Sequence, residues 1–124
     1  MSIQAIDHVQ LSYPAGQDAR LRDFYGRLVG LSEVGSPGRP PLRFRAGRQR
    51  IDLLPTENWL PTPAAAHLAF ETTELIPLRR RLLDAGFTID ETRPLPGHLR
   101  FYVTDPAGNA LEFLQPDPSQ GQTL

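Results

Sequence analysis

The chain has 124 residues, with 13 basic residues that are all arginine, 14 acidic residues, three histidines and no cysteine. Without cysteine and lysine there is no disulfide, thiolate zinc site, cysteine nucleophile, Schiff base or P-loop lysine. A formal net charge of −1 means that the chain lacks the excess of positive charge that is typical of proteins that bind nucleic acid or an anionic membrane. We expect a single domain over 1–124, and, because no signal peptide or long apolar run is seen, a cytoplasmic location.

The first half of the chain predicts the element order βαβββ. Alternating apolar and polar residues indicate a strand over 3–11, and apolar residues at helical spacing predict a helix from residue 17 or 18 to Gly30. Three shorter strands, separated by turns rich in Gly and Pro, are predicted at 31–34, 42–46 and 49–54. These elements form a unit that covers about 3–55.

The second half of the chain repeats this order after a linker over 56–64. A strand is predicted at 65–71 and a helix at about 73–85. Three further strands are predicted at 87–92, 98–104 and 109–114, followed by a polar, loose tail over 117–124. The second unit, about 65–116, therefore indicates an internal duplication.

Four polar residues occupy repeat-related strand positions. His8 and His67 lie in the first strand of each unit, and Asp52 and Glu112 lie in the last. Because side chains alternate along a strand, all four are predicted to point away from the apolar face that a helix would cover. If the two sheets curl together, the four side chains converge and offer two imidazoles and two carboxylates to Zn, Ni, Co, Mn or Fe(II). The alternative is that each is a hydrogen-bonded strand residue.

The same alternation places further polar side chains on the predicted site face. They are Gln10, Arg43, Arg45, Arg100 and Tyr102. Arginine binds a carboxylate or phosphate through paired hydrogen bonds, and a tyrosine hydroxyl can donate another. This lining predicts an anionic small-molecule substrate, whereas the alternative is a solvent-exposed sheet face on which arginine serves solubility.

Two motifs carry a resemblance to a known family. Phe24-Tyr25 followed by Gly30-Leu31, and Asp105-Pro106-Ala107-Gly108-Asn109 followed by Glu112-Phe113, resemble the vicinal oxygen chelate superfamily of glyoxalases, extradiol dioxygenases and bleomycin resistance proteins. The resemblance implies an α+β fold in which two βαβββ units form a curved mixed-sheet half-barrel cavity. It also implies metal ligands at His8, Asp52, His67 and Glu112, or at His8, His67 and Glu112 alone in dioxygenase-like members.

Departures from the family pattern narrow the expected chemistry. Asp52 is one methylene shorter than the usual Glu, and Ser12 and Thr56 stand where glutathione-handling members carry Arg and Asn. We therefore expect a homodimeric glyoxalase-like or dioxygenase-like enzyme that is not a true lactoylglutathione lyase. In it, a divalent cation chelates a small oxygenated anion and Glu112 or Asp52 is the base. The alternative is a metal-free binding protein of the bleomycin resistance type.

Overall fold

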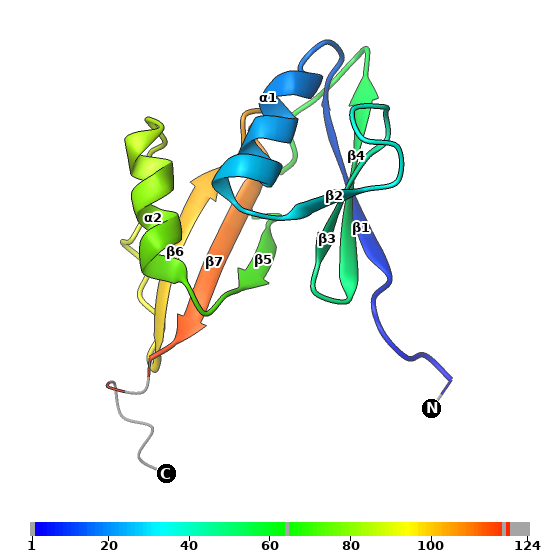
Figure 1. Cartoon of the computed structure of the whole chain (residues 1–124). Coiled ribbons are helices and arrows are strands. Elements are labelled where there is room, and N and C mark those ends of the chain that lie inside the picture. Colours follow the sequence, from blue (N-terminus) through cyan, green and yellow to red (C-terminus); the bar gives the residue numbers. More distant parts are fainter. Residues whose placement is uncertain (1, 64, 118, 120–124) are drawn as a thin grey trace. The chain divides into compact units, whose positions relative to one another are not determined.

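The structure is a computed structural model that describes residues 2–63, 65–117 and 119. The chain divides into two compact units, residues 1–61 and 62–124, and each unit contains one mixed sheet and its own helical segment (Figure 1). The predicted α+β class with two mixed sheets is confirmed, and neither sheet closes into a barrel. In the part of the chain that the structure describes, no helix is both long enough and apolar enough to cross a membrane.

Unit 1 has the predicted βαβββ order. Its elements are β1 (His8–Pro14), α1 (Asp18–Arg22), the π-helix η1 (Asp23–Leu28), β2 (Ser32–Val34), β3 (Leu42–Ala46) and β4 (Gln49–Thr56). The strand order in this sheet, called sheet A, is β1-β4-β3-β2. Strand β1 runs parallel to β4, while β3 is antiparallel to both β4 and β2. The last strand of the unit therefore lies beside the first.

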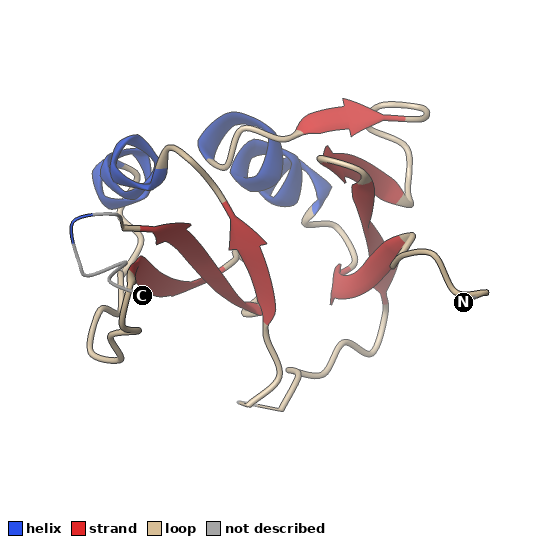
Figure 2. Cartoon of the chain, turned by 90° about the horizontal axis from the view of Figure 1, so that it is seen from below, coloured by secondary structure: helices blue, strands red, loops and turns tan. Residues whose placement is uncertain are grey.

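Unit 2 repeats the central part of this arrangement. Its elements are β5 (Leu68–Glu71), α2 (Leu75–Asp84), β6 (His98–Thr104) and β7 (Ala110–Pro116). In sheet B the order is β5-β7-β6, with β5 parallel and β6 antiparallel to β7 (Figure 2). As in sheet A, the last strand is paired in parallel with the first and antiparallel with its predecessor.

The cores of the two units follow the predicted alternation along their last strands. Ile51 and Leu53 in β4 are buried, as are Leu111 and Phe113 in β7. Each of these pairs alternates with residues on the opposite face of its sheet, because successive side chains of a strand point to opposite faces. The polar residue between the two apolar ones in each strand is thereby assigned to the face opposite the apolar core.

The predicted strand at 87–92 is wrong. The structure has there only an isolated bridge, in which Asp90 and Tyr102 exchange two backbone hydrogen bonds of 2.9 Å. The Asp90 side chain then accepts hydrogen bonds from the backbone N–H and the hydroxyl of Thr92. An aspartate that bonds two residues ahead turns the chain, and this turn ends the pairing after one bridge.

Several element ends also differ from the prediction. Strand β1 starts at His8 rather than residue 3, because its partner β4 starts at Gln49 and leaves residues 3–6 without a partner in sheet A. Strand β5 similarly starts at Leu68 rather than 65, next to the start of β7 at Ala110. Strand β7 extends to Pro116, beyond the predicted end at 114. Most of the predicted tail, 118 and 120–124, lies outside the described residues.

The predicted first helix is an α-helix that changes to a π-helix at Asp23. The backbone N–H of Val29 bonds to the carbonyl of Phe24, five residues earlier, at 2.9 Å. The wider turn places two consecutive aromatic residues, Phe24 and Tyr25, fully inside unit 1, where their rings meet edge to face at 5.0 Å. Local apolar spacing predicts a helix but does not distinguish a 3.6-residue turn from a wider one.

Candidate functional site

The carboxylate of Glu112 is positioned by the turn that precedes β7. Asp105 is buried, and its side chain accepts hydrogen bonds from the backbone N–H groups of Ala107 and Asn109 and from the Asn109 amide. These bonds fix the chain at the point where β7 begins, one residue after Asn109. The predicted motif therefore works first as a structural turn, and Glu112 is set at the third position of the strand that it starts.

His67 and Glu112 are in direct contact within unit 2. Ala69 is paired with Glu112 across β5 and β7, so that His67, two residues earlier, is a diagonal neighbour of Glu112 on one face. The Nε2 atom of His67 is 2.9 Å from Oε1 of Glu112. The Glu112 side chain is 8% exposed and that of His67 is 37% exposed. A buried carboxylate is thus presented next to a solvent-accessible imidazole.

Two predicted residues of β6 complete this cluster. Nη1 of Arg100 is 3.4 Å from Oε2 of Glu112. The Nε and Nη2 groups of Arg100 both donate hydrogen bonds to the backbone carbonyl of Arg93. Tyr102 is paired with Glu112 across the strands, and its ring lies edge-on to the His67 ring at 5.5 Å. The cluster of His67, Arg100, Tyr102 and Glu112 is therefore assembled within one unit.

Arg93 is a member of this cluster that the sequence did not indicate. Its guanidinium lies 3.7 Å from the centre of the Tyr102 ring, and it also forms an ion pair of 3.2 Å with Asp90. A cation over an aromatic face is attracted by the negative charge of the ring's π system. Arg93 lies outside any strand, so alternation could not have assigned it to a face.

The corresponding residues of unit 1 are arranged differently. Gln10 is paired with Asp52 and His8 with Arg50, so that His8 and Asp52 are diagonal neighbours, as His67 and Glu112 are in unit 2. However, Asp52 accepts two hydrogen bonds from Arg50, from Nε at 2.7 Å and from Nη2 at 3.1 Å. His8 instead contacts Asp7, with 2.9 Å between Nδ1 and Oδ2. The carboxylate of unit 1 is thus hydrogen-bonded to an arginine, whereas the corresponding carboxylate of unit 2 is hydrogen-bonded to a histidine.

Arg50 was also missed by the sequence prediction, although a signal for it exists. It precedes Asp52 by two residues in β4 and therefore shares its face. Two predicted substrate-binding residues, Arg43 and Arg45, lie on the same face of β3, and Nε of Arg43 is 3.8 Å from Oδ2 of Asp52. The positive charge of Arg50, two positions before Asp52 in the same strand, would have predicted the ion pair between these two residues.

The residues present fit a divalent cation better in unit 2 than in unit 1. Among residues 2–63, 65–117 and 119, no group of three His, Asp or Glu side chains is close enough to hold a metal ion. His67 and Glu112 supply an imidazole nitrogen and a carboxylate within one site, which are two ligand types that Zn, Mn and Fe(II) accept. Asp52 is compensated by two guanidinium groups and fits a metal poorly.

Comparisons with known proteins agree on one family. The model of the Glyoxalase/Bleomycin resistance protein/Dioxygenase superfamily matches residues 5–113. A glyoxalase family protein from Bacillus anthracis is 33% identical, with a TM-score of 0.84 over 94% of this chain and 98% of that chain. A search of curated proteins gave no match.

More distant solved structures share the fold. TnmS3, an antibiotic binding protein from Streptomyces sp. CB03234, is 22% identical with a TM-score of 0.70, over 94% of this chain and 99% of that one. A lactoylglutathione lyase from Agrobacterium tumefaciens is 23% identical with a TM-score of 0.71, over 93% and 96%. The fold is therefore shared by a catalyst and by a protein that binds a ligand.

Proposed function

Because the chain belongs to the glyoxalase/bleomycin resistance protein/dioxygenase superfamily, we propose that it is a divalent-metal-dependent enzyme that acts on a small oxygenated anion. The observation that carries the proposal is the 2.9 Å contact between Nε2 of His67 and the buried carboxylate of Glu112. A buried carboxylate needs a compensating partner, and an imidazole beside it supplies a metal site with a second ligand.

Of the two ligand sets that the sequence leaves open, we propose the three-ligand set. His67 and Glu112 are ligands from unit 2, and the sequence nominates His8 as the third. Asp52 is left out because its two carboxylate oxygens are engaged by Arg50. A divalent cation that chelates two adjacent substrate oxygens stabilises negative charge as it develops on them.

The remaining members of the unit 2 cluster orient the substrate and the ligands. Arg100 is held by the carbonyl of Arg93, and this fixes the direction of the N–H group that faces Glu112. A guanidinium fixed in this way can bind a substrate carboxylate without losing rotamer freedom. Tyr102, next to His67, offers a hydroxyl for a second hydrogen bond to the same substrate. Glu112 Oε2, which His67 does not engage, is the proposed proton acceptor.

The second candidate function is metal-free binding of a small molecule. It is favoured by the Arg50–Asp52 pair, because a unit whose carboxylate is occupied by arginine needs no cation. The antibiotic binding protein TnmS3 shows that this fold is used for binding. The two candidate functions differ in whether the purified protein holds a metal.

The test is elemental analysis of the full chain purified without chelator. We expect stoichiometric divalent metal in the parent, and its loss in His67→Ala, Glu112→Gln and His8→Ala. Asp52→Asn should keep the metal, and Glu71→Gln, which removes an exposed carboxylate from β5, is the matched control. A metal-free parent would overturn the proposal in favour of the binding protein, and loss of metal in Asp52→Asn would restore the four-ligand set.

Two reactions then divide the enzymatic readings. Oxygen consumption with catechols would indicate a dioxygenase, whereas turnover of methylglyoxal with glutathione would indicate a glyoxalase. Because Ser12 and Thr56 replace the residues typical of glutathione-handling members, we expect no turnover with the glutathione adduct. Light scattering of the same samples tests the proposed homodimer.

A further inference from the structure

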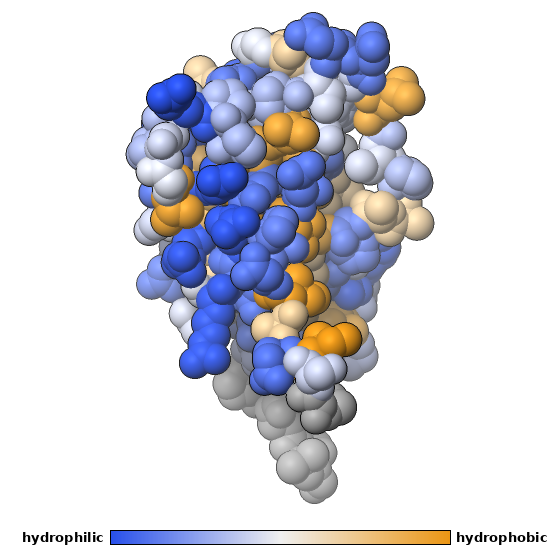
Figure 3. Space-filling model, turned by 90° about the vertical axis from the view of Figure 1, so that its right-hand side faces the viewer, coloured by the Kyte–Doolittle hydropathy of each residue, from blue (hydrophilic) through white to orange (hydrophobic). Residues whose placement is uncertain are grey.

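Three arginines share the face of sheet A that is opposite its apolar core. Arg43 and Arg45 are exposed on β3, and Arg50 is partly exposed on β4. Phe44 and Ile51, which alternate with them, are buried on the other face. Figure 3 views the molecule from the side where β1 lies in Figure 1, and hydrophilic side chains cover much of this surface.

The strand register brings two guanidinium groups and an imidazole together on this face. Arg50 lies directly opposite Arg45 on one side and directly opposite His8 on the other. Side chains at directly opposed positions in neighbouring strands are about 5 Å apart at Cβ, and like charges placed there are destabilising. The pair of Arg50 and Arg45 is therefore unfavourable unless negative charge lies close to it.

Asp52 compensates only part of this charge. Its buried carboxylate accepts both hydrogen bonds that Arg50 directs toward it and lies 3.8 Å from Nε of Arg43. Arg45 has no hydrogen bond or ion pair with any residue that the structure describes. Because Asp52 fixes Arg50 through two of its five N–H donors, the others keep a defined direction and stay available.

A second carboxylate lies at the His8 end of this row. Asp7 accepts a hydrogen bond from His8, and its side chain is 85% exposed. Three guanidinium groups still face two carboxylates, so that the face keeps an excess of positive charge.

We propose that Arg43, Arg45 and Arg50 form an oxyanion-binding site, with Asp52 as the positioning residue. The ligand class is a carboxylate or phosphate group, because the planar guanidinium matches the paired oxygens of these anions. The site lies within unit 1 and uses no metal ion. His8, next to Arg50, is also the third ligand of the function proposed above, but the three arginines bind no metal there, so that a test on the metal-free protein lets either proposal fail while the other stands.

The experiment is a titration of the chelator-treated full chain with inorganic phosphate at pH 7. Sodium chloride keeps the ionic strength constant, and binding is followed by the thermal midpoint and by ¹H–¹⁵N NMR of the arginine side chains. We expect a saturable shift, because a ligand that binds the folded state raises its stability with concentration. A parallel titration with acetate distinguishes a carboxylate ligand from a phosphate ligand. Absence of saturable binding of both anions would overturn the proposal.

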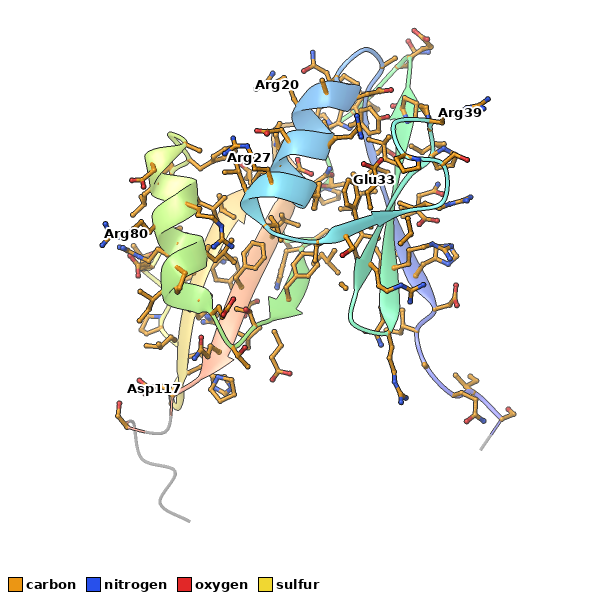
Figure 4. The ribbon with its side chains drawn as sticks, viewed as in Figure 1. Arg20, Arg27, Glu33, Arg39, Arg80 and Asp117 are labelled. Atoms are coloured by element: carbon orange, nitrogen blue, oxygen red, sulfur yellow. The ribbon has the colours of Figure 1, made fainter. Side chains whose placement is uncertain are left out.

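Charge-matched variants test the residues. The double variant Arg43→Gln/Arg45→Gln should weaken binding at least tenfold, and Arg45→Gln alone should weaken it measurably without loss of any described contact. Arg80→Gln is the control, because Arg80 projects from the outer side of α2 in unit 2 (Figure 4). Equal weakening by Arg80→Gln would show a nonspecific charge effect and overturn the site.

Asp52 offers a test of opposite sign. Asp52→Asn removes a negative charge, so simple electrostatics predicts tighter phosphate binding. If Asp52 positions Arg50, binding should instead weaken, the Nε signal of Arg50 should move, and Asp52→Glu should restore both. Tighter binding by Asp52→Asn would overturn the positioning role.

Discussion

The two units carry a carboxylate at the same place in the same kind of strand, yet the two carboxylates have different partners. Asp52 in β4 is bound by Arg50, whereas Glu112 in β7 is bound by His67. The residue two positions before the carboxylate accounts for the difference. It is Arg50 in β4 and Ala110 in β7, and a small side chain leaves room for the histidine to reach across.

This comparison shows how a duplicated unit acquires two chemistries. Alternation and register fix where the carboxylate points, and these are shared by the two sheets. The neighbour on the same face then decides whether the carboxylate is bound by an arginine of its own strand or by a histidine next to the first strand of the unit. We therefore expect one substitution at this neighbour to exchange the roles, with the largest effect of those predicted here.

Ala110→Arg should convert the unit 2 site into a copy of the unit 1 pair. An arginine at this position can bind Glu112 as Arg50 binds Asp52, and it would displace His67. We expect Zn²⁺ affinity to fall roughly 10- to 100-fold, by analogy with the loss of groups that orient metal ligands. Isothermal titration of the chelator-treated protein measures it, with Ala110→Ser as the control. Unchanged affinity would mean that the small residue at 110 does not permit the site.

The turns before the two carboxylate strands provide the next comparison. Each turn has a glycine at positive φ, Gly47 at +60° in unit 1 and Gly108 at +93° in unit 2, but the turn in unit 2 also depends on the buried side chain of Asp105. Asp105→Ala leaves buried donors without an acceptor, so we expect a loss of about 2–4 kcal/mol in the free energy of unfolding. Urea unfolding checks this, and Asp84→Ala, on the exposed end of α2, should change it by less than about 0.5 kcal/mol.

The carboxylates themselves should differ in structural importance. Asp52→Asn breaks a two-bond ion pair with Arg50 and leaves guanidinium groups uncompensated, and we expect a loss of about 1–3 kcal/mol in unfolding free energy. Glu112→Gln should cost less, because His67 can still donate to the amide oxygen and Arg100 lies at the longer distance of 3.4 Å. Urea unfolding of both metal-free variants decides the order. A greater loss for Glu112→Gln would reverse the comparison.

The smallest expected effect is on stability at low pH and concerns one acidic residue in a loop contact of each unit, Glu33 in unit 1 and Asp90 in unit 2. Burial alone would raise the pKa of Glu33, but hydrogen bonds from Arg22 and the Gly38 N–H lower it overall. Hydrogen bonds from Thr92, partly opposed by burial, lower the pKa of Asp90. A lowered folded-state pKa contributes stability above the unfolded-state pKa, and that contribution is lost as pH falls through the folded-state value.

The stabilising contribution of both residues should therefore be lost as pH falls below about 4, near the unfolded-state pKa values of these acids. We expect Glu33→Gln and Asp90→Asn each to flatten the decrease in thermal midpoint between about pH 5 and 3. The matched control is Glu57→Gln, which removes an exposed carboxylate that forms no hydrogen bond or ion pair with any residue that the structure describes. If the thermal midpoint of the control decreased as little with pH as that of the two variants, net charge rather than these hydrogen bonds would set the pH dependence.

Much of the fold could be predicted from local patterns. Strands β3 and β6 were predicted at their observed bounds, because regular alternation and flanking glycines mark their ends. The strand over 87–92 was wrong because one aspartate turn outweighs several β-forming residues. The start of β1 was wrong because a strand extends only as far as its partner, which lies some 40 residues away along the chain.

For the candidate site, alternation correctly places Glu112 with Tyr102 and Arg100, which the structure brings together within unit 2. It does not reveal Arg93, whose position depends on a loop. The metal assignment to His8, Asp52, His67 and Glu112, and the substrate-binding assignment to Gln10, Arg43 and Arg45, stay predictions.

The sequence by itself determined the duplicated unit, the α+β class and the face on which each strand side chain lies, because these follow from periods of two and 3.6 residues. The tertiary structure decided which charged groups meet: Arg50 with Asp52, and His67 with Glu112. Pairing between side chains depends on the register of strands far apart in the chain and on the space left by a neighbour such as Ala110, and neither is encoded in a local pattern.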